Sequence, residues 1–161
     1  MEPENKKSVT SLTSSQPKSL ETKQVSKIFQ TMKAIYGQKF MASFHSTEDI
    51  QQAQAVWARA LWFLDDHQVT KGLKKCAYLE DWNPNIPELI RLATGLPRKE
   101  ETVARVLSGD TEDEVSWRIR KKIGSWDIGH QTQSVIRTRV LGLYPEVYME
   151  VIEEMEGEDN A

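Results

Sequence analysis

Apolar residues recur at steps of three and four along most of this chain, and this period restricts the fold more than any other feature. The clearest stripe lies between residues 25 and 40 and comprises Val25, Ile28, Phe29, Met32, Ile35, Tyr36 and Phe40. No segment shows a sustained alternation of apolar and polar residues bounded by hairpin turns. The pattern therefore predicts an all-α fold, a small helical bundle with short loops between its early helices.

Capping residues and helix breakers mark the expected helix boundaries in the first half of the chain. Ser46 and Asp65 are each followed three residues later by a polar residue, so we expect helices to begin directly after both. Pro87 suits the first position of a further helix, which Gly95 and Pro97 would end. These signals divide the first half into short helices joined by tight turns.

The second half of the chain has the same period with weaker punctuation. A helix is expected over residues 112–124, and a last helical stretch begins near residue 131. Pro145 interrupts that stretch, so its end is either a kinked continuation or a separate helix.

Composition divides the chain into two helical units and two tails. Residues 98–111 have few apolar and many charged residues, so we predict a linker there, with at most a short helix. It would separate a helical bundle at 23–97 from a second helical unit at 112–155. Residues 1–22 are rich in Ser, Thr, Lys, Gln and Glu, which predicts a disordered N-terminal tail, and residues 156–161 are expected to form an acidic tail.

The charges are distributed unevenly along the sequence. The net charge is -3, yet seven of the 24 acidic residues follow Pro145, where no Lys or Arg occurs. The other 17 acidic residues are outnumbered by all 21 basic ones, so residues 1–145 carry a net charge of +4. A mildly basic body with an acidic end is compatible with a nucleic-acid partner and equally with an ordinary mixed-charge surface.

Neither a disulfide nor a membrane span is expected. Cys76 is the only cysteine, and it falls on the apolar side of a short predicted helix. No apolar run approaches the length of a membrane span, and the polar N-terminal residues do not resemble a signal peptide. We therefore expect a cytosolic protein.

The sequence offers no catalytic constellation. His45, His67 and His130 are not at metal-ligand spacing from one another, and no nucleophile has a recognisable paired base. The glycines form neither a Walker-type nor a dinucleotide-binding loop. We therefore expect a binding protein rather than an enzyme, without a cofactor or a metal site.

Two tryptophans lie beside basic residues in a pattern that is compatible with a nucleic-acid ligand. Trp117 and Trp126 flank the most basic run in the chain, and aromatic rings beside cations are what single-stranded nucleic acid requires for its bases and phosphates. The alternative is that both tryptophans belong to the core beside a solvated basic face. The candidate nucleic-acid-binding residues are Lys74, Lys75, Trp82, Trp117, Arg118, Arg120, Lys121 and Lys122.

Three blocks in order give the chain a family resemblance. The first is an apolar-aromatic helix ending at Phe44, a polar turn and a helix bearing Trp57. The second runs from Val69 to Ala93, with Gly72, a Lys-Lys pair and a Trp-Asn-Pro-Asn-Ile-Pro turn, and the third begins at Ser116-Trp117 and continues into a helix rich in Arg and Val. Together they resemble the replication protein P family of lambdoid phages and prophages, over some three quarters of the chain.

The resemblance implies a specific role. Members of that family are non-enzymatic loaders that bind the ring-shaped replicative helicase of the bacterial host, hold it inactive and deliver it to the phage origin through an initiator protein. They also contact single-stranded DNA weakly. The family's layout implies initiator contact in the N-terminal part and helicase contact within residues 112–152. This chain is shorter than the lambda member and ends in acidic residues instead of a longer C-terminal extension.

An adaptor of this kind needs apolar anchors that dock into clefts of its partner. The segment 135–155 presents such positions on one side, with acidic residues opposite. The candidate helicase-binding residues are Val140, Leu143, Val147, Tyr148 and Val151.

Two other functions fit parts of the sequence. The second block also resembles the C-terminal domain of a bacterial primosome assembly protein, which would make the chain a single-stranded DNA-binding module with Trp82, Lys74 and Lys75 facing DNA. A helix-turn-helix over residues 127–143 is the weaker alternative, because its turn lacks two flanking helices of suitable length.

Overall fold

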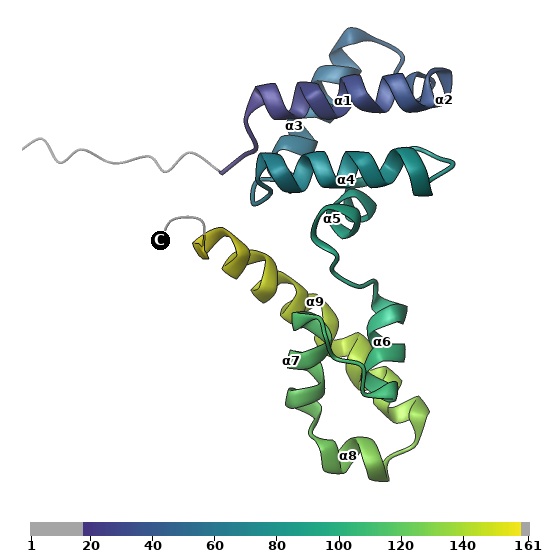
Figure 1. The fold of residues 1–161 in the computed structure, drawn as a ribbon, viewed down its shortest axis with the longest axis vertical. Coiled ribbons are helices and arrows are strands. Elements are labelled where there is room, and N and C mark those ends of the chain that lie inside the picture. The colour runs from purple at the N-terminus through teal and green to yellow at the C-terminus, as the bar shows by residue number, and fades with distance from the viewer. Residues whose placement is uncertain (1–17, 159–161) are drawn as a thin grey trace, which may run out of the picture.

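The computed structural model describes residues 18–158, with side chains through Met155, and confirms an all-α fold (Figure 1). None of these residues forms a strand. The helices are α1 (Thr22–Tyr36), α2 (Gln38–Met41), α3 (Thr47–Ala60), α4 (Asp66–Leu79), α5 (Ile86–Thr94), α6 (Lys99–Ser108), α7 (Glu114–Ile123), α8 (Ser125–His130) and α9 (Gln133–Glu158).

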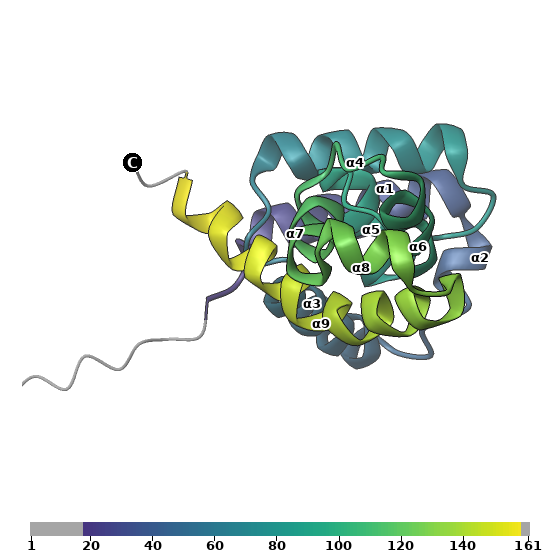
Figure 2. The ribbon, with the colours of Figure 1, turned by 90° about the horizontal axis from the view of Figure 1, so that it is seen from below.

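The helices pack as two groups that are consecutive in the chain. In the first, α1 contacts α2, α3 and α4, and α4 also packs along α5. In the second, α9 contacts α6, α7 and α8, and α6 also packs against α7. Figure 1 shows the first group above the second, and Figure 2, from below, shows α9 crossing the molecule and extending past the other helices at its C-terminal end.

Most of the expected helix starts are correct to within a residue. Ser46 and Asp65 are the N-caps of α3 and α4, and Asp65 forms a reciprocal capping box with Gln68. Asn85 caps α5 one residue earlier than expected, so Pro87 is the second residue of that helix. Gly95 ends α5 in the left-handed conformation that glycine adopts without strain.

A glycine sets the close approach of α4 and α5. A Cβ atom built on Gly72 would lie 3.1 Å from both Cβ of Ala93 and Cδ1 of Leu89. The glycine therefore lets α5 lie nearly against the backbone of α4, and this fixes the turn that carries Trp82 between them. The core beneath contains the predicted stripe of residues 25–40 except for Ile35, which is half-buried at its edge. The Tyr36 hydroxyl donates to the Cys76 carbonyl over 3.1 Å.

The short helix expected within residues 98–111 is confirmed, but this segment is not a linker. Most of it is α6, whose buried Thr102, Val103 and Val106 pack in the second group. The few apolar residues of this segment are spaced so that they share one face, and the many charges occupy the other. The second unit therefore begins at Lys99 rather than at residue 112.

The last helix is continuous through its proline. α9 runs unbroken from Gln133 to Glu158 with Pro145 inside it, so the end of the chain is a continuation and not a separate helix. Its buried residues include Ile136, Val140 and Val147, which shows that one face contacts the core on both sides of the proline. Tertiary packing thus outweighs the missing backbone hydrogen bond.

The predicted N-terminal tail, residues 1–22, lies largely outside the described residues. The chain is already packed at Leu20, which shortens the predicted tail. Leu20 is buried, and its backbone N–H donates to the Ala58 carbonyl at the end of α3 over 2.8 Å. The predicted acidic tail, residues 156–161, lies outside the described side chains, and α9 covers its first three residues.

In the part of the chain that the structure describes, none of the helices combines the length and apolar character that crossing a membrane requires.

Candidate functional site

Three of the five predicted helicase-binding residues are not available to a partner. Val140, Val147 and Val151 are buried in the core of the second group. The prediction is corrected on this point, because the apolar side of α9 is used to hold the helix onto α6 and α7. Leu143 and Tyr148 are half-buried at the edge of that core.

Tyr148 instead lines a groove between the two helical groups. The groove has a volume of about 550 Å³ and is walled by the end of α3, by α5, by the start of α6 and by α9. Its apolar lining comprises Ala60, Trp62, Phe63, Pro87, Ile90, Pro97, Tyr144, Tyr148, Met149 and Ile152. Such a surface is suited to a bulky apolar side chain or to one face of a helix.

A buried hydroxyl fixes the floor of the groove. Tyr144 donates from its hydroxyl to the Pro97 carbonyl over 2.8 Å, which ties α9 to the segment joining the two groups. The Tyr144 ring stacks on Tyr148 with centroids 5.2 Å apart. Burial raises the pKa of Tyr148 to about 12, so its hydroxyl stays protonated and can donate to a ligand.

An ion-pair cluster forms the polar rim of the groove. The Glu88 carboxylate accepts from Arg91 Nε over 2.9 Å and also from Arg98, while Arg91 reaches Glu80 over 3.4 Å. Burial opposes ionisation of Glu88, but the hydrogen bonds from the two arginines outweigh it and hold its pKa below its usual range. The rim thus joins α4, α5 and the start of α6.

The basic run of α7 is largely engaged within the molecule. Arg118 pairs with Glu114 and with Glu154 of α9, and Lys122 pairs with Glu146 and Glu150 of α9. The structure thus places two of the predicted nucleic-acid-binding cations against the acidic half of α9.

The other residues of the run differ in their surroundings. The prediction that Arg120 binds nucleic acid is corrected, because its guanidinium is engaged inside the protein. It donates to the Val106 carbonyl and lies against Gly109. Lys121 remains exposed, with Nζ 4.8 Å from the ring centroid of Trp117. Trp117 is 45% exposed and therefore is not a core residue.

A second exposed aromatic surface lies at the end of α4. Trp82 is 68% exposed, and Tyr78 and Leu79 beside it in sequence are also exposed. The ammonium group of Lys39 on α2 lies 4.5 Å from the Trp82 ring centroid.

The predicted lysines Lys74 and Lys75 lie one turn before this aromatic group on α4, the first exposed and the second half-buried. Lys39 was missed by the sequence analysis because it lies 43 residues from Trp82, on a short helix that no capping signal marks.

Cys76 and His130 are both engaged in contacts within the protein. Burial raises the pKa of the Cys76 thiol to about 11, which makes it a weak nucleophile. His130 stacks on Trp126, with ring centroids 4.3 Å apart. Within residues 18–155, no cluster of three or more His, Cys, Asp or Glu side chains could hold a metal ion.

Searches of protein-family models, of curated proteins and of solved structures found nothing that matches this chain.

Proposed function

We propose that this protein is a non-enzymatic helicase loader of a phage or prophage, which binds the replicative helicase of its bacterial host and recruits it to the origin through an initiator protein. The observation that carries the proposal is the groove between the two helical groups, with Trp62, Tyr148 and Met149 in its wall. The resemblance of the three sequence blocks to the replication protein P family supports the same role.

A loader needs only binding energy that differs between states of the helicase ring. A helix of one helicase subunit that inserts its apolar face into the groove would contact both helical groups at once. The groove is lined by residues of both helical groups, which the segment between α5 and α6 joins. The loader would thus favour the ring state whose helix fits the groove.

This assignment moves the helicase contact from the buried face of α9 to its groove-facing side. Tyr148 is retained from the predicted set, and Met149, which is 48% exposed, is added to it. Initiator contact by the N-terminal part remains a prediction.

The test is size-exclusion chromatography of the chain mixed with the host's replicative helicase at moderate salt and without DNA. The wild-type chain should co-elute, and Met149→Glu should reduce the complex by at least roughly tenfold in affinity, because a charge would enter an apolar contact. The matched control is Val135→Glu, which changes a residue of similar exposure on the same helix outside the groove. If the wild-type chain and the helicase eluted separately at micromolar concentrations, the proposal would be wrong.

The exposed Trp82–Lys39 pair favours a second candidate function, a primosomal single-stranded DNA-binding module. A base can stack on the Trp82 ring while Lys39, Lys74 and Lys75 approach phosphates. An oligothymidylate should then quench tryptophan fluorescence with strong salt dependence, and Trp82→Ala should weaken binding where Trp126→Ala does not. Equal affinity of these two variants would exclude the Trp82 surface.

A further inference from the structure

The cationic side of α7 forms two parallel rows. Arg118 and Lys122 are four residues apart and make up the row that faces α9. Trp117 and Lys121 have the same spacing and make up the adjacent row, which is open to solvent. An aromatic face beside a line of cations is the arrangement that binds single-stranded nucleic acid.

The row facing α9 is covered by carboxylates from the same chain. Glu146, Glu150 and Glu154 lie at successive turns of α9, about 6 Å apart along the helix axis. Lys122 Nζ lies 3.4 Å from Glu146 and 3.1 Å from Glu150, and Arg118 bonds Glu154 through two guanidinium nitrogens. With Glu114, four carboxylates surround two cations, so this side repels a polyanion.

We propose that Glu146, Glu150 and Glu154 of α9 occupy, in cis, a binding surface on α7 for single-stranded nucleic acid, and that they compete with its phosphates for Arg118 and Lys122. The strand would contact the paired row through its phosphates and Trp117 through its bases. This surface is distinct from Trp82 and from the groove, and the proposal rests on the predicted nucleic-acid role of α7 and not on helicase loading.

The carboxylates can withdraw without unfolding α9. The side chains of Glu146 and Glu154 are 68% and 63% exposed, so their rotamers can turn to water. Val147, Val151 and Ile152 stay buried and keep the helix in place. The pairs of Lys122 with Glu146 and Glu150 are exposed single contacts and are weak, so phosphates can replace them. The pair of Arg118 with Glu154 has two hydrogen bonds, which a phosphate can match with two of its own oxygens.

The test compares two variants with the same change in net charge. Glu146→Gln/Glu150→Gln/Glu154→Gln removes the competing carboxylates. The control, Glu21→Gln/Glu48→Gln/Glu153→Gln, removes three exposed carboxylates for which the structure shows no ion pair. Affinity for a labelled oligothymidylate is measured by fluorescence anisotropy over a salt series.

The first variant should bind roughly tenfold more tightly than the control, with a log–log salt slope steeper by about 1.4, since each of the two released cations, Arg118 and Lys122, contributes about 0.7 for a single strand. Adding Arg118→Gln and Lys122→Gln to it should abolish the gain. The double variant Glu146→Gln/Glu150→Gln should show a smaller gain if the triple variant folds poorly. Equal affinity of the control and of both carboxylate variants would overturn the proposal, whereas loss of helicase co-elution would concern only the proposed loader function.

Discussion

Arg118 on α7 and Glu154 on α9 are 36 residues apart in the chain and are joined by two hydrogen bonds, one of them 2.8 Å long. The same guanidinium reaches Glu114 on its own helix over 2.7 Å. The hydrogen bonds to Glu154 and Glu114 raise the pKa of Arg118, and the bonds from Arg118 lower the pKa of Glu154. The acidic end of the sequence is therefore, as far as Glu154, part of the second helical group and a partner of its basic helix.

A side chain at position 72 should destabilise the protein, because Gly72 lies in close contact with α5. Gly72→Ala should lower the free energy of unfolding by about 1–2 kcal/mol, because its Cβ would press on the backbone-fixed Cβ of Ala93 and overpacking outweighs the gain in helix propensity. Urea denaturation followed by circular dichroism measures the change.

The matched control for this prediction is Gly142→Ala. Gly142 also lies inside a helix, but nothing lies within 4 Å of the built Cβ atom, so alanine should stabilise the protein by about 0.5–1 kcal/mol. If both substitutions stabilised the protein equally, close contact of α4 and α5 at Gly72 would be disproved.

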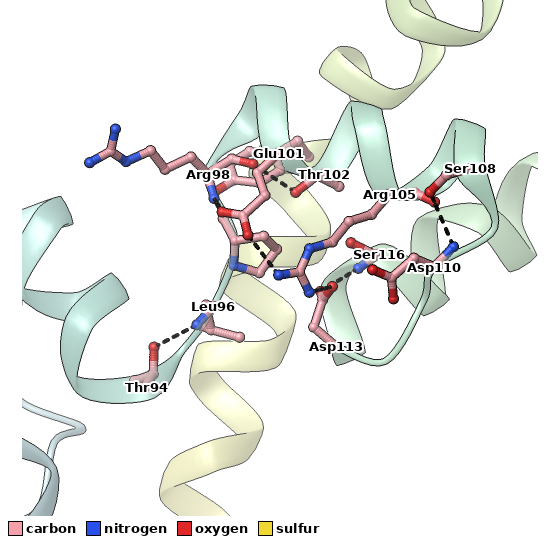
Figure 3. Close-up of polar contacts among 12 residues, drawn as sticks. Thr94, Leu96, Arg98, Glu101, Thr102, Arg105, Ser108, Asp110, Asp113 and Ser116 are labelled. Atoms are coloured by element: carbon pink, nitrogen blue, oxygen red, sulfur yellow. Dashed lines mark hydrogen bonds and ion pairs between the residues drawn. The ribbon is translucent and has the colours of Figure 1, made fainter. Parts of the chain in front are cut away.

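Asp113 should stabilise the packing of α7 on α6 through two interactions of its carboxylate. One carboxylate oxygen accepts from the backbone N–H of Ser116 over 2.8 Å, and the other accepts from Arg105 over 2.9 Å (Figure 3). Asp113→Ala loses the N-cap bond and the ion pair, and should lower the free energy of unfolding by about 1–2 kcal/mol. Asp113→Asn keeps an oxygen that can cap α7, and should lower it by less than about 1 kcal/mol. Thermal denaturation of both variants checks the order.

Asp110→Ala serves as the comparison for Asp113. Asp110 is exposed in the same loop, and the structure shows only its backbone N–H bonded, to Ser108. Loss of the Asp110 carboxylate should change the free energy of unfolding by no more than about 0.5 kcal/mol. A cost as large as that of Asp113→Ala would mean that the loop, and not the cap, determines the effect.

The carboxylate of Glu88, on the rim of the groove, should make the free energy of unfolding fall at acid pH. Its pKa in the folded protein lies below the ordinary value of 4.5, so the folded state binds fewer protons than the unfolded chain near that pH. The contribution of Glu88 is therefore complete above about pH 4.5 and is lost as the pH falls through its folded-state pKa. The urea midpoints of wild type and Glu88→Gln should differ at neutral pH and converge in acid.

Glu112→Gln is the control for this pH dependence, because Glu112 is exposed and the structure shows no ion pair for it. Its midpoint should follow the wild type at every pH. A difference between wild type and Glu88→Gln that persists unchanged in acid would show that Glu88 acts through packing and not through its charge.

Local signals in the sequence were sufficient to predict much of the fold. The caps at Ser46 and Asp65 depend on residues three positions away, and the α1 stripe depends on spacings of three and four, so both can be read without the fold. The same holds for Gly95, whose position after the last apolar residue of α5 marks a helix end.

The candidate site could be predicted only in part, because it depends on contacts between distant residues. An apolar stripe on α9 indicates a buried face but not whether this chain or a partner buries it, and Val140, Val147 and Val151 proved to be core. The partners of Lys122 lie 24 and 28 residues away, and Lys39 meets Trp82 across the first helical group. Such pairings become visible only once the helices are packed.

Tyr144 should hold α9 to the segment that joins the two helical groups, through one hydroxyl. Tyr144→Phe leaves the buried Pro97 carbonyl without its donor and should cost about 1 kcal/mol. The matched variant is Tyr36→Phe, which removes a comparable buried bond, to Cys76, inside the first group alone. Hydrogen exchange followed by mass spectrometry locates each effect.

Exchange in Tyr144→Phe should accelerate in α9 and in the segment around Pro97, because the hydrogen bond between them is lost. In Tyr36→Phe it should accelerate in α1 and α4 and leave α9 unchanged. Both variants share the same chemical change, so a difference in where exchange rises can come only from where the hydroxyl bonds. Identical exchange patterns in the two variants would show that the groups open as one unit and that the Tyr144 bond does not control the groove.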